Sequence, residues 1–397
     1  MAKLHLFYPS NDIALAVDNP GFTPPAATIA LGKDGSALPL WYGDSGDMAL
    51  AAVNGRWFEE MAETFGLCTD VWSGDTDACA YPDEGTARLS LAPWGWSKAV
   101  RAIFSGYGFD KTSMPDDGQL ERLRQLSSRV TGAIVPATLR SDGLPVSSAP
   151  TIITDSKTAN RGHLPPYIQV VGISQLPELT AKGNWVAKQP WSSSGRGIAA
   201  SAHNKEAFEK MVAASVKRQG AAIIEPFHEH SRDFAMLFEM KGESCWYVGL
   251  SLFGTDEKFG YTGNLVAEEG ILVHTLTESG EISVDLLETL SEKLKTVLVD
   301  VYPGYNGPLG VDMMLLPGQT GDRVAIAEIN LRRTMGHVAH ALTYTALAPG
   351  RRGWYSVKRK TPQAKPVEYK VKDRRLSEGT LLLTPNTTQW DFQLSVL

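Results

Sequence analysis

The sequence predicts a protein of mixed α/β and α+β class, with an open α/β lobe at the N-terminus followed by two α+β lobes. Three observations support this class. A chain of 397 residues that is 43% hydrophobic can bury the cores of two or three lobes. Strand-like and helix-like segments alternate in the first third, whereas paired strand-like segments dominate after residue 151. We expect lobes at residues 1–150, 151–226 and 227–350, and a basic connector with a C-terminal extension at 351–397.

The composition of the chain limits the classes of binding partner and the cellular location that we expect. The net charge of −6 gives no reason to expect nucleic acid or a membrane as a partner, and no segment approaches the roughly 18 apolar residues of a membrane span. Cys68, Cys79 and Cys245 are an odd number without CxxC spacing, which indicates neither a disulfide framework nor a zinc site. The first residues, broken by Pro9 and Asp12, predict a strand rather than a signal peptide. We expect a cytoplasmic protein, and a homodimer is an option that the sequence leaves open.

The first lobe begins with a strand at residues 3–8. The turn PSND after it would lie at the carboxyl end of that strand, where open α/β sheets bind ligands. Helical periodicity marks residues 47–65, 97–104 and 117–130, with Gly and Pro residues between these segments.

The second lobe is predicted to carry a glycine-rich hairpin. Strands at residues 184–189 and 197–202 flank the loop, and a helix at 205–218 follows, with Asn204 as its N-cap. A strand AAIIEPF at 221–227 ends the lobe.

The third lobe is predicted to be an antiparallel sheet with one long helix. The alternation in DFAMLFEM and SCWYVGLSLF indicates two strands, and a helix follows at residues 283–300. A hairpin at 311–330 then turns near 319 or 320. The segment 351–375, with ten Lys or Arg against two Asp or Glu, is either a solvated connector or a surface for phosphates or an acidic partner.

The loop at 192–197 raises the question of phosphate binding. The P-loop pattern GxxxxGK[ST] does not occur, and the GxGxxA match at 195–200 runs into a strand rather than a helix, which argues against a dinucleotide fingerprint. A glycine-rich loop between antiparallel strands can instead fold over a polyphosphate and donate backbone N–H groups. Lys188 would then neutralise phosphate oxygens. The alternative is an exposed hairpin without a ligand.

The hairpin at 311–330 brings three oxygen-bearing side chains together. Asp312 lies roughly opposite Glu328, and Asn330 shares a face with Glu328 because strand side chains repeat every two residues. Facing carboxylates repel each other unless a cation joins them, and Mg²⁺ prefers such oxygen ligands together with nucleotide phosphates. The alternative, a solvated carboxylate pair, is disfavoured by the nearly continuous apolar neighbours.

Four segments of the chain, taken together, resemble the ATP-grasp superfamily, which includes glutathione synthetase, D-alanine-D-alanine ligase and biotin carboxylase. They are VAKQPWSSSGRGI at 186–198, IIEPF at 223–227, GVDMML at 310–315 and AEINLR at 327–332. They occur in the order of the superfamily over about residues 150–345. The resemblance implies an ATP-grasp fold in which the two α+β lobes hold ATP and Mg²⁺ between them.

The resemblance also implies roles for individual residues. Lys188 would bind the α- and β-phosphates, with Lys157 as an earlier nucleotide lysine, and Arg332 would be the cation near the reacting groups. Backbone groups at Glu225 and Phe227 would form hydrogen bonds with the adenine. Glu229 or Asp233 would accept hydrogen bonds from the ribose hydroxyls. The flap over the phosphates would consist of Ser192, Ser193, Ser194, Gly195, Arg196 and Gly197, and the metal ligands would be Asp312, Glu328 and Asn330.

The activity that the resemblance implies is that of an ATP- and Mg²⁺-dependent ligase, which converts a small carboxylate into an acylphosphate and joins it to an amine. A phosphotransferase on the same fold and a nucleotide-binding protein without turnover are the alternatives. AEINLRRTMGH replaces the EVNTxPG of the dipeptide ligase, so the substrate of that enzyme does not carry over. Trp94 and Trp96 can stack on a ligand or belong to the core, and His337 fits a structural role better than a catalytic one.

Overall fold

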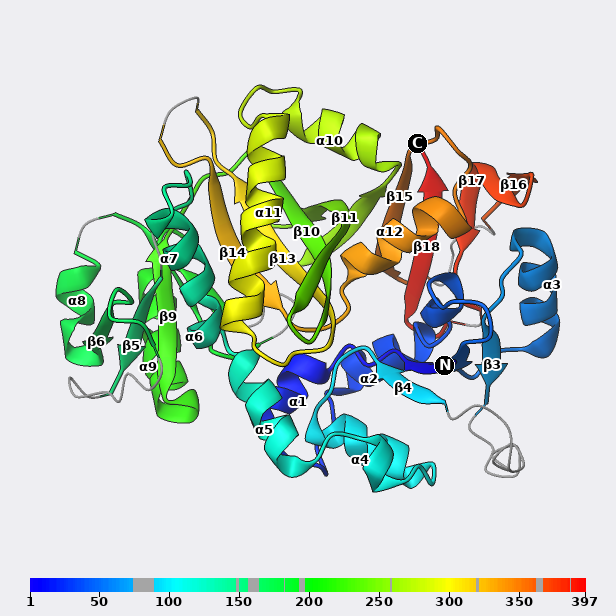
Figure 1. Ribbon diagram of the computed structural model, residues 1–397, viewed down its shortest axis with the longest axis horizontal. Helices are drawn as coiled ribbons and strands as arrows, with labels where there is room; N and C mark the ends of the chain where they lie inside the picture. Colours follow the sequence, from blue (N-terminus) through cyan, green and yellow to red (C-terminus); the bar gives the residue numbers. More distant parts are fainter. Residues whose placement is uncertain are drawn as a thin grey trace.

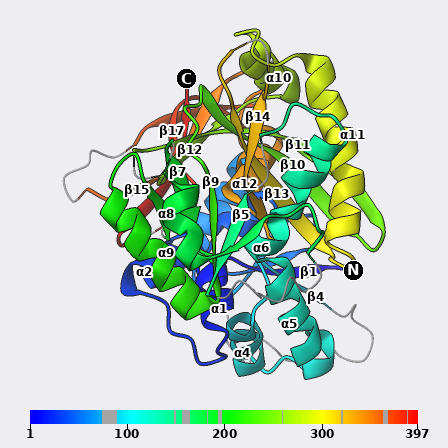
Figure 2. The ribbon, with the colours of Figure 1, turned by 90° about the vertical axis from the view of Figure 1, so that its left-hand side faces the viewer.

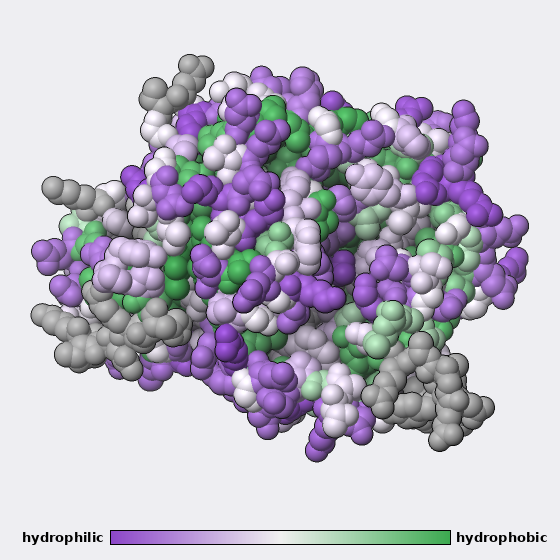
Figure 3. Space-filling model, viewed as in Figure 1, coloured by the Kyte–Doolittle hydropathy of each residue, from purple (hydrophilic) through white to green (hydrophobic). Residues whose placement is uncertain are grey.

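The computed structural model consists of three β-sheets and the helices that cover them (Figure 1). It describes residues 1–73, 89–147, 150–155, 164–181, 183–192, 197–257, 259–318, 321–361, 367–385 and 387–397. Within these ranges, every helix is too short or too polar to cross a membrane. Hydrophilic side chains cover much of the face in Figure 3, with apolar side chains visible among them.

The N-terminal lobe is an open α/β unit, as predicted. Its four strands are parallel and lie in the order β3-β2-β1-β4. The strands are β1 (Lys3–Leu6), β2 (Met48–Leu50), β3 (Asp70–Trp72) and β4 (Ser90–Pro93). The helices are α1 (Asn11–Val17), α2 (Ala26–Asp34), η1 (Leu38–Trp41), α3 (Gly55–Phe65), α4 (Lys98–Gly106), η2 (Lys111–Ser113) and α5 (Asp117–Leu126).

The segment 47–65 is not the single helix that was predicted. Its first part is strand β2, which pairs in parallel with β1. Helix α3 begins only at Gly55, because the side chain of Asn54 caps it and accepts a hydrogen bond from the N–H of Arg56 (2.9 Å). The apolar run before Asn54 is short and continuous, which suits a strand buried in a parallel sheet.

The second lobe, at the left of Figure 1 and in front in Figure 2, carries a five-stranded sheet in the order β6-β5-β9-β7-β8. Asn204 caps its long helix, as predicted, and accepts from the N–H of Ala207 (2.9 Å). The helices that lead to this lobe are α6 (Arg129–Gly132) and α7 (Ile134–Ser141). The elements of the lobe are β5 (Thr151–Thr154), β6 (Val170–Gly172), η3 (Ile173–Gln175), α8 (Leu176–Leu179), β7 (Trp185–Lys188), β8 (Ile198–Ala200), α9 (Lys205–Gln219) and β9 (Ala221–Pro226).

The third lobe is built on an antiparallel sheet, and α11 covers one of its faces. Buried leucines of α11 pack against Phe234, Met236 and Phe238 of β10, so the alternate residues of this strand, such as Ala235, face the other side. The elements are β10 (Arg232–Lys241), β11 (Ser244–Thr255), β12 (Tyr261–Val266), α10 (Glu269–Thr277), α11 (Val284–Val301), β13 (Gly307–Leu315), β14 (Val324–Asn330) and α12 (Met335–Thr345).

Residues 351–397 are not a separate extension, in contrast to the predicted connector. They form β15 (Gly353–Arg359), β16 (Tyr369–Lys372), β17 (Arg375–Leu382) and β18 (Trp390–Val396), which continue the third sheet to nine strands. Charged and apolar residues alternate in segments such as YKVK, and Tyr355, Leu381 and Leu394 are buried in one core with α12 and the N-terminal lobe. Five of the basic residues therefore belong to paired strands of this sheet and not to a free linker: Lys358, Arg359, Lys370, Lys372 and Arg375.

Candidate active site

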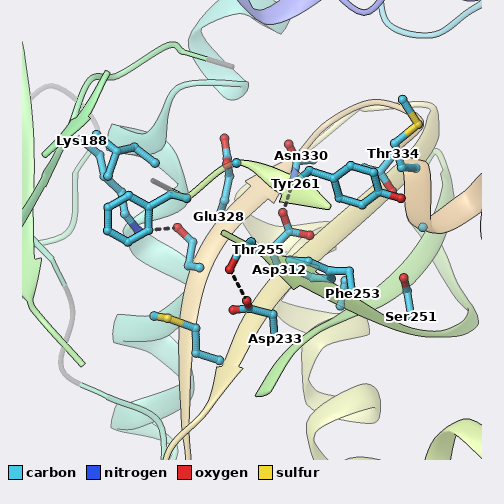
Figure 4. Close-up of a pocket in the computed structure, with 18 of the residues that line it drawn as sticks. Lys188, Asp233, Ser251, Phe253, Thr255, Tyr261, Asp312, Glu328, Asn330 and Thr334 are labelled. Atoms are coloured by element: carbon cyan, nitrogen blue, oxygen red, sulfur yellow. Dashed lines mark hydrogen bonds between the residues drawn. The ribbon is translucent and has the colours of Figure 1, made fainter. Parts of the chain in front are cut away.

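A cleft of about 730 Å³ lies where the three lobes meet. The second lobe contributes the ends of β7 and β9, and the third lobe contributes the face of its sheet opposite α11. The N-terminal lobe contributes α1, α2 and the end of β4, and the C-terminal strands close the remaining side. The close-up shows Asp312, Glu328 and Asn330 at one end of the β13–β14 hairpin, with Lys188 approaching from the second lobe (Figure 4).

The floor of the cleft carries the predicted carboxylate pair. Asp312 and Glu328 are direct partners in the β13–β14 ladder, and Asn330 Nδ2 donates to Asp312 Oδ2 (2.8 Å). Burial raises the pKa of Asp312 to about 7, and the nearby Glu328 carboxylate adds to the effect. Two carboxylates and an amide oxygen can together bind a divalent cation, although the described residues contain no group of three His, Cys, Asp or Glu suited to a metal.

A β-bulge explains why Ala327 and Glu328 both line the cleft. Asp312 pairs with Glu328 while Met313 pairs with Ile326, so Ala327 is the extra residue of β14. Its carbonyl oxygen accepts a hydrogen bond from Lys188 Nζ (2.8 Å). The bulge thus links the floor of the cleft to the second lobe.

Lys188 forms an ion pair with Glu225, and both side chains are almost completely buried. The two residues lie on neighbouring antiparallel strands, β7 and β9. The Lys188 ammonium thus lies on the cleft beside the Asp312–Glu328 pair, held in place by a carboxylate and a carbonyl oxygen.

The predicted nucleotide residues from β9 to the start of β10 also line the cleft: Glu225, Phe227, Glu229 and Asp233. The N–H of Phe227 donates to the carbonyl oxygen of Asn184 (2.8 Å), which continues the β7–β9 ladder by one pair and leaves this N–H already bonded within the protein. Asp233 accepts from Thr255 Oγ1 (2.7 Å). Its hydrogen bond with His230 Nε2 (3.1 Å) raises the pKa of that histidine.

Arg332 lines the cleft next to the floor and forms a bidentate pair with Asp12 of α1. Arg332 Nε and Nη2 donate to the Asp12 carboxylate at 2.6 to 2.9 Å. Burial alone would lower the pKa of the guanidinium, but the nearby carboxylates, Asp12 first among them, together outweigh this and the net shift is upward. The PSND turn after β1 therefore reaches the cleft, as the position of that turn in the sequence suggested.

Arg129 is a residue that the sequence did not single out. At the start of α6, its Nη2 donates to Glu328 Oε1 (2.6 Å) and its Nη1 to Ser192 Oγ (2.7 Å) and to the carbonyl oxygen of Gln189 (2.8 Å). No pattern around position 129 distinguishes it from a surface arginine, because its partners come from other lobes.

The flap residues can be followed only in part. Ser192 is buried and lines a small cavity next to the cleft together with Glu328 and Asn330. Gly197 has φ of +70°, and a Cβ there would lie 2.7 Å from Gln189 Oε1, so the position requires glycine. The remaining predicted residues lie outside the described residues: Lys157, Ser193, Ser194, Gly195 and Arg196.

Three further residues named from the sequence take different places. Trp94 lines the cleft. Trp96 packs into the core of the N-terminal lobe beside Phe104. His337 is buried, and its Nδ1 accepts from the N–H of Thr334 (3.1 Å), which fits a structural role.

Comparison with known proteins gives matches among solved structures. No protein-family model matches the chain. No curated protein matches it either. A biotin carboxylase from Campylobacter jejuni in complex with β,γ-ATP is 12% identical, with a TM-score of 0.49, over 100% of this chain and 88% of the other.

Two further structures match over 100% of this chain. Carboxyaminoimidazole ribonucleotide synthase from Aspergillus clavatus, complexed with ATP, is 10% identical with a TM-score of 0.46 over 94% of its own length. A protein from Archaeoglobus fulgidus assigned to the ATP-grasp superfamily is 14% identical with a TM-score of 0.44 over 100% of its own length.

Proposed function

We propose that this chain is an ATP-grasp ligase that uses ATP and Mg²⁺ to activate a small carboxylate as an acylphosphate and joins it to an amine, with release of ADP and phosphate. The observation that carries the proposal is the joint placement of Lys188, the Asp312–Glu328 pair and Asn330 on one cleft between lobes. These residues are far apart in the sequence, and they supply the cation and the oxygen ligands that a metal-bound triphosphate needs.

The carboxylate pair fits a divalent cation. The raised pKa of Asp312 reflects a buried, repelling pair, and a bound cation would relieve both the burial cost and the repulsion. Asp312, Glu328 and Asn330 would hold the metal. When bound, Mg²⁺ would neutralise charge on the phosphates during transfer.

The lining of the cleft supports the nucleotide orientation that the resemblance implies. Lys188 would bind phosphate oxygens, and the hinge after β9 would face the adenine, with Phe227 beside the cleft. Asp233, which already accepts from Thr255, would offer its carboxylate to the ribose hydroxyls. Glu229 is the alternative acceptor for these hydroxyls.

The proposed reaction requires no protein nucleophile. An oxygen of the substrate carboxylate attacks the γ-phosphorus, the bond from that phosphorus to the β,γ-bridging oxygen breaks, and ADP leaves. The amine nitrogen then attacks the acyl carbon, phosphate leaves and the nitrogen loses its proton. Lys188 and Arg332 would stabilise the charge on the transferring group, because each is held in place by a buried or half-buried carboxylate.

The experiment that tests this proposal separates ADP from AMP as product. The protein is incubated with ATP, Mg²⁺ and pools of carboxylic acids and amines, and released nucleotides are resolved by chromatography. ADP that appears only with an acid and an amine supports the ligase. AMP would exclude the acylphosphate route, and a phosphorylated product without an amide would indicate a phosphotransferase.

The variant Glu328→Gln should lose turnover and keep its fold, because it removes one metal-binding charge from an otherwise similar side chain. Circular dichroism and thermal unfolding check the fold. Glu239→Gln, an exposed carboxylate on β10 of the same sheet, is the matched control and should keep full activity. Near-normal turnover of Glu328→Gln would contradict the assigned metal role.

A further inference from the structure

The part of the cleft beyond Arg332 has a largely apolar wall, which nothing in the proposed nucleotide site uses. The wall combines segments from both ends of the chain: α1 and α2, the end of β4, the start of α12, and strands β15 and β18. Its side chains are Pro9, Ile13, Ala27, Leu31, Trp94, Met335, Val357 and Trp390.

The wall is fixed by contacts within the protein. Trp390 Nε1 donates to the carbonyl oxygen of Ala27 (3.3 Å), and its backbone N–H donates to Asp34 Oδ2 (2.9 Å). The guanidinium of Arg359 lies 4.9 Å from the Trp390 ring centroid. On the other side, the Trp94 ring packs edge-on against Phe7 at 4.9 Å. An apolar surface held in this way is ready for a ligand without rearrangement.

The lysine and arginine side chains that line the cleft in the described part of the chain already have acidic partners. Among the described residues that line the cleft, the lysine and arginine side chains are Lys188 and Arg332, which face Glu225 and Asp12. The polar groups of the opposite wall satisfy one another: Asn264 Nδ2 donates to Ser251 Oγ (2.8 Å), and the hydroxyl of Tyr261 donates to Asn264 Oδ1. A second negative charge on a substrate would therefore lose its hydrating water without gaining an unpaired lysine or arginine from the described lining of the cleft.

We propose that the acid activated at this site is a monocarboxylate with an uncharged, largely apolar body, either aliphatic or aromatic. Its carboxylate lies near Arg332 and Asn330, next to the transferred phosphoryl group. Its body lies against the wall that includes Leu31, Val357 and Trp390. The inference rests on the proposed function, because it assigns the acid of that reaction.

Hydroxylamine trapping tests the choice of acid without knowledge of the amine. The hydroxylamine nitrogen attacks the acyl carbon of an acylphosphate, phosphate leaves, and a hydroxamate forms as the nitrogen loses a proton. The hydroxamate is then detected as its coloured complex with iron(III). The apolar acids tested are 3-phenylpropionate and 4-methylpentanoate. The acids with additional negative charge are succinate and 3-phosphoglycerate, and each acid is supplied with ATP and Mg²⁺. We expect kcat/KM for the two apolar acids to be higher by at least about tenfold, and a preference for succinate or 3-phosphoglycerate would overturn the inference.

Two variants place a charge on the wall or directly beside it. Leu31→Asp and Thr28→Asp both alter side chains of α2 that line the cleft, and Thr28 lies in the first turn, where an acidic side chain is well tolerated. Each should weaken binding of 3-phenylpropionate by about tenfold. Ile29→Asp, on the exposed side of the same helix, is the matched control and should bind like the unmodified chain. Equal loss in the control would contradict the inference.

Equilibrium binding separates failure of the inference from failure of the proposed function. Binding of each acid is measured by calorimetry with the protein saturated with Mg²⁺ and a non-hydrolysable ATP analogue. If the apolar acids bind but give no hydroxamate, the wall is supported as the binding surface for the acid and the ligase reaction is contradicted. Hydroxamate from charged acids alone would support acylphosphate chemistry and overturn the inference, as would a lack of binding by both apolar acids.

Discussion

Lys188 connects two lobes through one ammonium group, which pairs with Glu225 on the next strand and donates to the bulged carbonyl of Ala327. Replacement by Met should therefore have two effects. It removes a cation from the proposed phosphate site, and it leaves the buried Glu225 carboxylate without its partner, which costs about 3 kcal/mol of folding free energy.

The double variant Lys188→Met/Glu225→Gln separates these effects. It should recover much of the lost stability in urea unfolding, because no unpaired charge remains buried. Its affinity for Mg²⁺ and an ATP analogue should stay at least about tenfold below that of the unmodified chain, measured by calorimetry. If affinity returns together with stability, Lys188 has no direct role in nucleotide binding.

Strand periodicity allowed part of the site to be predicted from local sequence. The alternation in AEIN predicts Glu328 and Asn330 on one face, and the hairpin predicts Asp312 opposite Glu328. In the structure Asp312 pairs with Glu328 in the β13–β14 ladder. Asp12 and Arg129 could not be found in this way. Asp12 pairs with an arginine 320 positions away and Arg129 with a glutamate 199 positions away, so only the tertiary fold brings these charges together.

At the scale of elements, helix α2 and the loop before β18 depend on Asp34. Its carboxylate accepts hydrogen bonds from the backbone N–H groups of Thr388, Gln389 and Trp390 at 2.8 to 2.9 Å. Burial alone would raise the pKa of Asp34, but these hydrogen bonds outweigh it and the net shift is downward. Folding therefore favours the ionised carboxylate.

The sign of this shift gives a pH-dependent prediction. The contribution of Asp34 is fully present above the unfolded carboxyl pKa of about 4 and is lost as pH falls through the lower folded pKa. Asp34→Asn should reduce the free energy of unfolding by about 1–3 kcal/mol at pH 7, with a smaller difference near pH 3, in urea titrations. Asp44→Asn, at an exposed carboxylate, should change little at either pH. A difference for Asp34→Asn that does not vary with pH would contradict this account.

Elements with strong local signals were predicted well, and those defined by tertiary pairing were not. Helix α9 has an N-cap and a glycine at its end, and both boundaries follow the sequence. Strand β2 was predicted as part of a helix because its partner β1 lies more than forty residues earlier. The bulge at Ala327 has no Gly or Pro to mark it, yet it determines which groups of β14 line the cleft.

At the scale of the whole molecule, the C-terminal strands belong to the common core. Tyr355, Leu381 and Leu394 pack with Trp41 of the N-terminal lobe and with α12, and Trp41 Nε1 donates to the carbonyl oxygen of Leu383 (2.7 Å). A chain truncated after residue 350 should therefore expose this core and fail to fold cooperatively. Size-exclusion chromatography and thermal unfolding measure the outcome, and a monomeric truncated chain with a sharp transition would instead support a separable extension.

The resemblance in sequence extended over the second and third lobes, where the motifs lie, and predicted the class of these lobes. It did not predict that α1, α2, β15 and β18 would close the cleft, because these elements carry no phosphate or metal motif. Their contribution is shape and apolar surface, which depends on how distant segments pack.

We propose that a metal-bound triphosphate lies between Lys188 and the floor formed by Asp312, Glu328 and Asn330. A crystal structure with Mn²⁺ and a non-hydrolysable ATP analogue tests it most directly, because anomalous scattering locates the metal. We expect a Mn²⁺ peak in contact with Asp312 and Glu328 and a phosphate oxygen within hydrogen-bonding distance of Lys188 Nζ. A nucleotide bound elsewhere, or a metal that contacts neither carboxylate, would contradict it.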